Sequence, residues 1–121
     1  MNQDGLNKVI ELKADGKSGN KGLEEAVAQH LQDYFELWKR KQHDYGTGNI
    51  AKFGELGCLV RASDKMERLT TLHKREDDAA NEPYVDSWKD LLGYAVIALT
   101  ILSGNWPGTP QYKGAKSSPK K

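Results

Sequence analysis

Two aspartates, Asp86 and Asp90, are the first candidates for chemistry, because they stand four residues apart in a segment with helical periodicity. At that spacing their carboxylates lie one turn apart on the same face of a helix. The same face continues into Gly93, Ile97 and Ile101, which are not residues expected to face water. Carboxylates beside a buried surface are unfavourable unless positive charge meets them. A divalent metal ion or a cluster of Lys and Arg side chains would supply that charge.

A second set of charges lies earlier in the chain. Gly57, Arg61, Asp64 and Arg68 fall on one continuous face of a predicted helix, and Lys65 flanks them. One interpretation is an ion-pair ladder, which contributes little to stability if it is exposed to solvent. The other is a phosphate site, in which Arg61, Lys65 and Arg68 bind the phosphates and Asp64 holds a metal ion. Guanidinium groups suit this role because they donate two parallel hydrogen bonds to an oxyanion.

These side chains need helices to position them, and the spacing of apolar residues predicts three main ones. The predicted helices span residues 23–42, 53–73 and 84–103. Pro83 suits the start of the last helix, since its missing N–H is not needed there. A further short helix is possible near residues 4–14. The expected fold class is therefore all-α, a small helical bundle with short connections.

The apolar residues also predict which helix faces are buried. The expected core stripe of the middle helix is Leu56, Leu59, Met66 and Leu69, with Phe53 and Val60 beside it. The expected apolar stripe of the last helix is Trp88, Leu91, Leu92, Ala95, Leu99 and Leu102. Because the opposite face of this helix is also apolar toward its end, we expect it to contact both its own chain and a partner. Oligomerisation would then complete the bundle, in a homodimer or a higher oligomer.

Composition divides the chain into three parts. Residues 1–22, with three glycines close together at their end, are expected to form a flexible arm. Residues 23–104 form the predicted helical domain. Residues 105–121 are rich in Gly, Pro, Ser and Lys and are predicted to be a disordered basic tail.

Charge and cysteine content narrow the classes of function. The chain has 121 residues and a net charge of +1, which argues against nucleic-acid binding through bulk charge. Cys58 is the single cysteine, so a disulfide within the chain and a cysteine-based zinc site are excluded. The longest apolar run, Leu91 to Leu102, is too short to span a membrane, and no secretory signal is expected. The expected location is the cytoplasm, which would be the host cytoplasm for a phage-encoded chain.

Several segments between about residues 39 and 100 carry a family resemblance. They are Lys41-x-x-Asp44-Tyr45-Gly46-x-x-Asn49-Ile50, Phe53-Gly54, Val60-Arg61-x-x-Asp64-Lys65-x-x-Arg68-Leu69 and Asn81-Glu82-Pro83-x-x-Asp86-x-x-x-Asp90-Leu91-x-Gly93-Tyr94-Ala95. Together they resemble a phage and bacterial family called nucleotide modification associated domain, whose members are often labelled MazG-like.

The resemblance implies a nucleotide pyrophosphohydrolase. Domains of this broad MazG and all-α dUTPase type assemble into homodimers or homotetramers and cleave nucleoside triphosphates into a monophosphate and pyrophosphate. Their chemistry uses acidic side chains that hold Mg²⁺, with Mn²⁺ as the alternative, and the ion activates water and neutralises phosphate charge. Well-studied relatives carry Glu-Glu-x-x-Glu on one helix and Glu-x-x-Asp on the next. This sequence departs from that pattern, because Ala28 stands where a third glutamate would follow Glu24 and Glu25.

With this departure, the resemblance implies a different set of acids. The expected metal ligands are Asp64, Asp86 and Asp90. Glu67 is expected to be an auxiliary ligand or the catalytic base. The residues expected to bind substrate are Arg61, Lys65 and Arg68 for the phosphates and Asn49 and Tyr94 for the base or sugar.

Three functions stay open on these residues. The leading hypothesis is a Mg²⁺-dependent pyrophosphohydrolase of phage nucleotide metabolism that acts on deoxynucleoside triphosphates or modified ones. The second is a non-catalytic protein that binds a nucleotide signal of the host and sequesters it, for which metal would be dispensable. The third is a helical inhibitor that docks on a host protein, in which the charged faces would serve as ion pairs between subunits.

Overall fold

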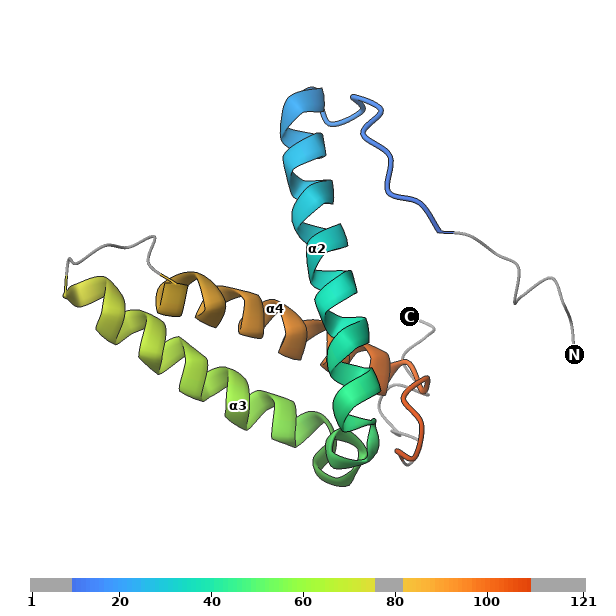
Figure 1. Cartoon of the computed structure of the whole chain (residues 1–121), viewed down its shortest axis with the longest axis vertical. Helices are drawn as coiled ribbons and strands as arrows, with labels where there is room; N and C mark the ends of the chain where they lie inside the picture. The colour runs from blue at the N-terminus through green and yellow to red at the C-terminus, as the bar shows by residue number, and fades with distance from the viewer. Residues whose placement is uncertain (1–9, 76–81, 110–121) are drawn as a thin grey trace, which may run out of the picture. The chain divides into compact units, whose positions relative to one another are not determined.

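The computed structural model describes residues 10–75 and 82–109. They form three helices, α2 (Lys21–Tyr45), α3 (Gly48–Lys74) and α4 (Glu82–Leu102), and contain no β-strand (Figure 1). The predicted all-α fold class is thereby confirmed at the level of secondary structure. Within these described ranges, no helix combines the length and the apolar character that crossing a membrane requires.

The helix boundaries follow the sequence-based prediction closely, with one exception. α3 begins at Gly48 instead of residue 53, because a helical turn precedes a kink at Gly54 and is joined to the rest of the helix. Of the possible helix over 4–14, residues 10–14 are not helical and residues 4–9 lie outside the described residues.

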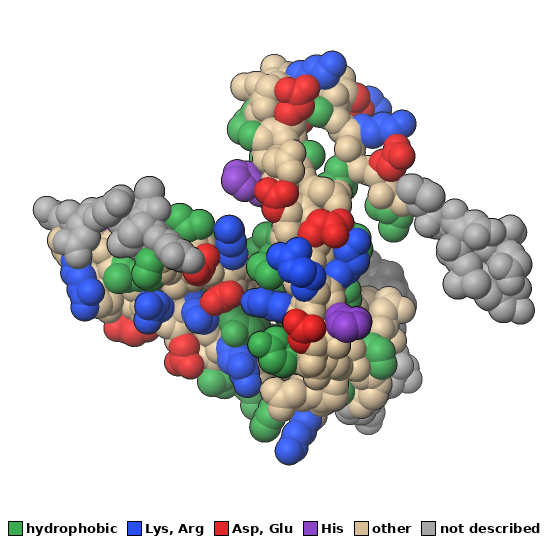
Figure 2. Space-filling view, in the orientation of Figure 1, with side chains coloured by type: hydrophobic (Ala, Val, Ile, Leu, Met, Phe, Trp, Pro, Cys, Tyr) green, Lys and Arg blue, Asp and Glu red, His purple; other side chains and the backbone are tan. Residues whose placement is uncertain are grey.

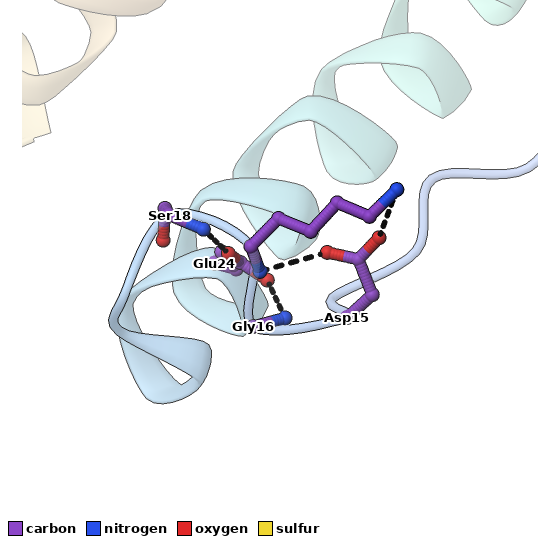
Figure 3. A network of polar contacts seen from close by, with 5 residues as sticks. Asp15, Gly16, Ser18 and Glu24 are labelled. Carbon is purple, nitrogen blue, oxygen red and sulfur yellow. Dashed lines mark hydrogen bonds and ion pairs between the residues drawn. The ribbon is translucent and has the colours of Figure 1, made fainter.

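The chain divides into two compact units, Met1–Leu37 and Trp38–Lys121, and the division falls inside α2. In the first unit, the start of α2 is fixed by its own side chains. The Leu23 N–H donates to Asn20 Oδ1 over 2.9 Å, which is the usual contact of an N-cap residue. The Glu24 carboxylate accepts the N–H groups of Gly16 and Ser18, each over 2.7 Å (Figure 3). These bonds hold residues 15–20, which the sequence assigns to a flexible arm, in a defined turn.

In the second unit, α3 and α4 lie side by side and run in opposite directions (Figure 1). The buried side chains of the pair lie on one side of each helix, as helix packing requires. They are Cys58 and Leu69 of α3 and Ser87, Ile97 and Ile101 of α4. The α4 face that packs on α3 is therefore the one that also carries Asp90.

The large apolar side chains predicted to fill the core lie mostly on the outside of this unit. Among the stripe expected in α3, Leu69 is buried, whereas the exposed members are Phe53, Leu56, Leu59, Val60 and Met66. On α4, Trp88 and Leu99 are 51% and 67% exposed. The physical reason is that each helix has two apolar sides, and α3 and α4 use the smaller, more polar one against each other.

Residues after α4 belong to the same core. Trp106 is 4% exposed, and its indole Nε1–H donates to the Thr47 carbonyl over 3.2 Å. Its ring meets that of Trp38 edge to face, with centroids 6.2 Å apart. Residues 105–109, which the sequence assigns to the tail, thus pack on the connection between α2 and α3. The remaining tail, residues 110–121, lies outside the described residues.

Candidate functional site

Most of the residues predicted to do chemistry gather along the seam between α3 and α4. Two contacts join the half of the seam that holds the end of α3 and the start of α4. Lys65 meets Asp90, and the rings of His73 and Tyr84 stack with centroids 6.4 Å apart. Acidic and basic side chains alternate over these two helices on the face that Figure 2 shows.

One pocket on the seam, which we term the charged pocket, holds both predicted aspartates and two predicted cations. Its lining residues are Lys65, Arg68, Pro83, Asp86, Ser87 and Asp90. It is open to solvent and has a volume of about 350 Å³. Four residues that the sequence predicts to bind phosphate or metal therefore line one pocket, although they belong to two separate helices.

Asp90 carries the best-defined electrostatic contacts of this pocket. Lys65 Nζ lies 2.9 Å from Asp90 Oδ2, a charge-assisted hydrogen bond. Lys41 Nζ, from the last turns of α2, lies 3.9 Å from Asp90 Oδ1. At that distance the second pair is Coulombic and not a hydrogen bond. The positive charge that we expect beside this carboxylate from the sequence is therefore supplied by two ammonium groups.

A second pocket, which we term the narrow pocket, follows one helical turn farther along the seam. Its lining residues are Asn49, Ile50, Phe53, Gly54, Gly57, Cys58, Arg61 and Tyr94. Arg61 precedes Lys65 by four residues, and Tyr94 follows Asp90 by four, so the two pockets adjoin. The narrow pocket has a volume of only about 10 Å³, which is room for about one water molecule.

The backbone of α3 is irregular at the narrow pocket. Gly54 has φ 64° and ψ −156°, a conformation that is essentially confined to glycine. Gly57 permits the resulting close approach, because a Cβ there would lie 2.6 Å from the Cβ of Phe53. At the bottom of the pocket, burial raises the pKa of the Cys58 thiol, and Glu55 adds to that effect. Cys58 is therefore a neutral packing residue at neutral pH.

Two predicted residues, Asp64 and Glu67, line neither pocket, and both are exposed. Successive residues of an α-helix are about 100° apart around its axis. Lys65 is turned toward α4, so Asp64 falls on the solvent side of the same turn. The sequence could place Asp64 on the basic row but could not show which edge of that row faces α4.

The charged pocket offers two carboxylates, those of Asp86 and Asp90, to a metal ion. Within residues 10–75 and 82–109, no three His, Cys, Asp or Glu side chains are grouped closely enough to enclose an ion by themselves. Mg²⁺, however, usually takes one or two carboxylates and completes its shell with water and phosphate oxygens. Asp86 and Asp90 supply that number, provided that Asp90 exchanges its ammonium partners for the ion.

Lys41 is a member of the site that sequence reasoning missed. The lysines and arginine at the end of α2 are adequately explained by favourable interaction with the helix dipole. The available signal was the Lys41-x-x-Asp44-Tyr45-Gly46 segment, which carries part of the family resemblance but no obvious role.

Glu24 and Glu25 are remote from this chemistry in sequence and differ in their contacts. The pKa of Glu24 is lowered by hydrogen bonds, first from Ser18 and then from the Gly16 N–H. Its two oxygens both accept from the 15–20 turn. Its carboxylate thus has a sufficient local role as part of the α2 cap.

Comparison with known proteins identifies no relative of this chain. No protein-family model, no curated protein sequence and no solved structure matches the chain significantly.

Proposed function

We propose that the chain is a Mg²⁺-dependent nucleoside triphosphate pyrophosphohydrolase. The observation that carries the proposal is the composition of the charged pocket, which Lys65 and Arg68 of α3 line together with Asp86 and Asp90 of α4. Cations that suit phosphate oxygens and carboxylates that suit Mg²⁺ share one open depression. The family resemblance of the same residues supports the choice of reaction.

In this proposal the substrate's phosphates lie in the charged pocket. Lys65 and Arg68 bind and orient them there. Asp86 and Asp90 would hold Mg²⁺, which would neutralise phosphate charge and make a bound water more acidic. Arg61 lies one turn from Lys65 and extends the row of cations toward the narrow pocket. That pocket has room for about one water molecule, so a contact of Asn49 or Tyr94 with sugar or base requires the pocket to widen. Asp64 and Glu67, exposed and outside both linings, receive no part in it.

We further propose that the chain acts as a homodimer or homotetramer. The support is the set of large apolar side chains that one copy leaves exposed on α3 and α4, which are Leu56, Leu59, Val60, Met66, Trp88 and Leu99. Large exposed apolar surface marks association sites in soluble proteins. Light scattering at micromolar concentration tests it, and a monomeric mass would contradict the proposal.

A turnover screen tests the enzymatic proposal. The purified chain is incubated with canonical and modified nucleoside triphosphates and with Mg²⁺ or Mn²⁺, and the products are separated by chromatography. We expect monophosphate and pyrophosphate from at least one substrate. No product from any of them, from a folded protein, would overturn the assignment.

One observation favours a second candidate, a nucleotide-binding protein without catalysis. Asp90 is already neutralised by Lys41 and Lys65, so the site does not depend on a metal ion for its charge balance. Such a protein would bind a nucleotide tightly in the presence of a chelator and release it unchanged. Equilibrium binding with EDTA, followed by chromatography of the recovered ligand, separates the two candidates.

A further inference from the structure

Asp90 is an internal anion held by two cations from different helices. Its oxygens face Lys65 Nζ over 2.9 Å and Lys41 Nζ over 3.9 Å. The side chains of Lys41, Lys65 and Asp90 are 46%, 30% and 27% exposed, so solvent and solutes reach all three. Ammonium groups on long flexible stems bind any nearby oxyanion as point charges. A phosphate that enters the charged pocket therefore meets cations that already have a carboxylate partner.

We propose that a phosphate group of the ligand displaces Asp90 from Lys41 and Lys65, which makes Lys41 a third phosphate-binding residue of the charged pocket. The proposal rests on the proposed function, because it assumes that this pocket takes phosphates. It adds an exchange of partners: the ammonium groups pass from the carboxylate to the phosphate. Asp90 then becomes free to contact a cation that accompanies the ligand.

The exchange has a cost that can be measured without a metal ion. Binding gains two ammonium–phosphate contacts but loses the two contacts with Asp90. Partly exposed ion pairs contribute little individually. Together these two pairs correspond to roughly a five- to tenfold reduction in phosphate affinity. Removing the negative charge of Asp90 should therefore strengthen phosphate binding, although the same residue is needed for catalysis.

The test is calorimetric titration of the full chain with inorganic tripolyphosphate in EDTA. We expect Asp90→Asn to bind about five- to tenfold more tightly than the unaltered chain. The matched control is Asp86→Asn, which makes the same charge change one turn away in the same pocket. We expect its gain to stay below about twofold, because the ion pairs of Lys41 and Lys65 in the described residues are with Asp90 and not with Asp86. Equal gains in the two variants, or no measurable tripolyphosphate binding by any of them, would overturn the proposal.

A second set of variants tests Lys41 without altering Asp90. Lys41→Met should weaken tripolyphosphate binding about threefold in the unaltered chain and about tenfold in the Asp90→Asn background, where no carboxylate competes. Lys74→Met, an exposed lysine that lines neither pocket, is the control. If Lys41→Met behaves like Lys74→Met, Lys41 is not a phosphate ligand. Turnover in the nucleotide screen without these binding changes would leave the enzyme assignment intact and refute only the exchange.

Discussion

Two carboxylates of this chain, Glu24 in the turn that opens α2 and Asp90 on the α3–α4 seam, are each held by two polar partners, but the partners differ in kind. Those of Glu24 are backbone N–H groups of the adjacent turn, at 2.7 Å each. Those of Asp90 are the ends of two long side chains from α2 and α3. The first arrangement cannot be exchanged without opening the turn. The second can be exchanged by side-chain rotation alone, which takes place in picoseconds to nanoseconds for exposed residues.

The difference shows how a structural acid can be told from one available to a ligand. Both residues are acidic, lie on helices and adjoin a leucine in sequence, so residue type and local sequence do not distinguish them. The kind of partner distinguishes Glu24 from Asp90. The partners of Glu24 are backbone groups of the folded turn, whereas those of Asp90 are ammonium groups at the ends of flexible side chains. Four experiments test this difference between Glu24 and Asp90.

The largest expected effect is the fall in turnover when Asp90 loses its charge. Asp90→Asn should lower turnover by about 100-fold or more, because a metal ion supplies several kcal/mol of transition-state stabilisation. Glu24→Gln should leave turnover within about twofold of the unaltered chain, as its carboxylate contacts only the 15–20 turn. Initial rates of pyrophosphate release measure both, with circular dichroism to confirm folding. Full activity in Asp90→Asn would remove the metal assignment.

A smaller effect is expected from the cations that face Asp86 and Asp90. Lys65→Met and Arg68→Met should each raise KM about tenfold, since a hydrogen bond to a charged group contributes roughly 1.5–3 kcal/mol before solvent screening. Lys74→Met again serves as the control. Unchanged KM values in both variants would place the phosphates elsewhere.

For Glu24, the expected effect is confined to the turn that its carboxylate holds. Glu24→Gln should speed amide hydrogen exchange at Gly16 and Ser18 several-fold, because the neutral amide is a weaker acceptor for their N–H groups. Glu25→Gln is the matched control, since its side chain is exposed and one residue away. Equal exchange rates in the two variants would show that Glu24 does not hold the turn.

The smallest effect is the pH dependence of the same turn. The folded-state pKa of Glu24 lies below its usual value of 4.5. Its contribution to stability is therefore complete above the unfolded pKa and is lost as the pH falls through the lower, folded one. The amide shifts of Gly16 and Ser18 should move in that acidic range in the unaltered chain and not in Glu24→Gln. A transition at or above pH 4.5 would mean that the carboxylate is not stabilised by these bonds.

The sequence predicts features that depend on neighbouring residues in the chain. It does not predict which face of one helix packs against another helix. Periodicity and end residues predicted the three helices, because helix formation depends on neighbours in sequence. Periodicity could not show that Ile97 is buried and Leu99 exposed, since both lie on apolar sides of α4. Which side packs inward depends on the complementary side of α3.

The candidate site was predictable in its residue types but not in its register. Asp86 and Asp90 were paired correctly, because one helix places both. Whether they share a pocket with Lys65 and Arg68 depends on how far α4 is displaced along α3. The spacing of residues within one helix does not give that displacement. The same limit explains Lys41, whose contact with Asp90 joins residues that lie far apart in the chain.

The bond from Trp106 to Thr47 also bears on how the chain folds as it leaves the ribosome. The two residues are 59 positions apart, and the corner between α2 and α3 lacks this hydrogen bond until the later one has been synthesised. At about 5–20 residues per second, that interval is roughly 3–12 s. During it, the exposed indole of Trp38 and the apolar stripes of α3 are open to chaperones or to a second nascent copy.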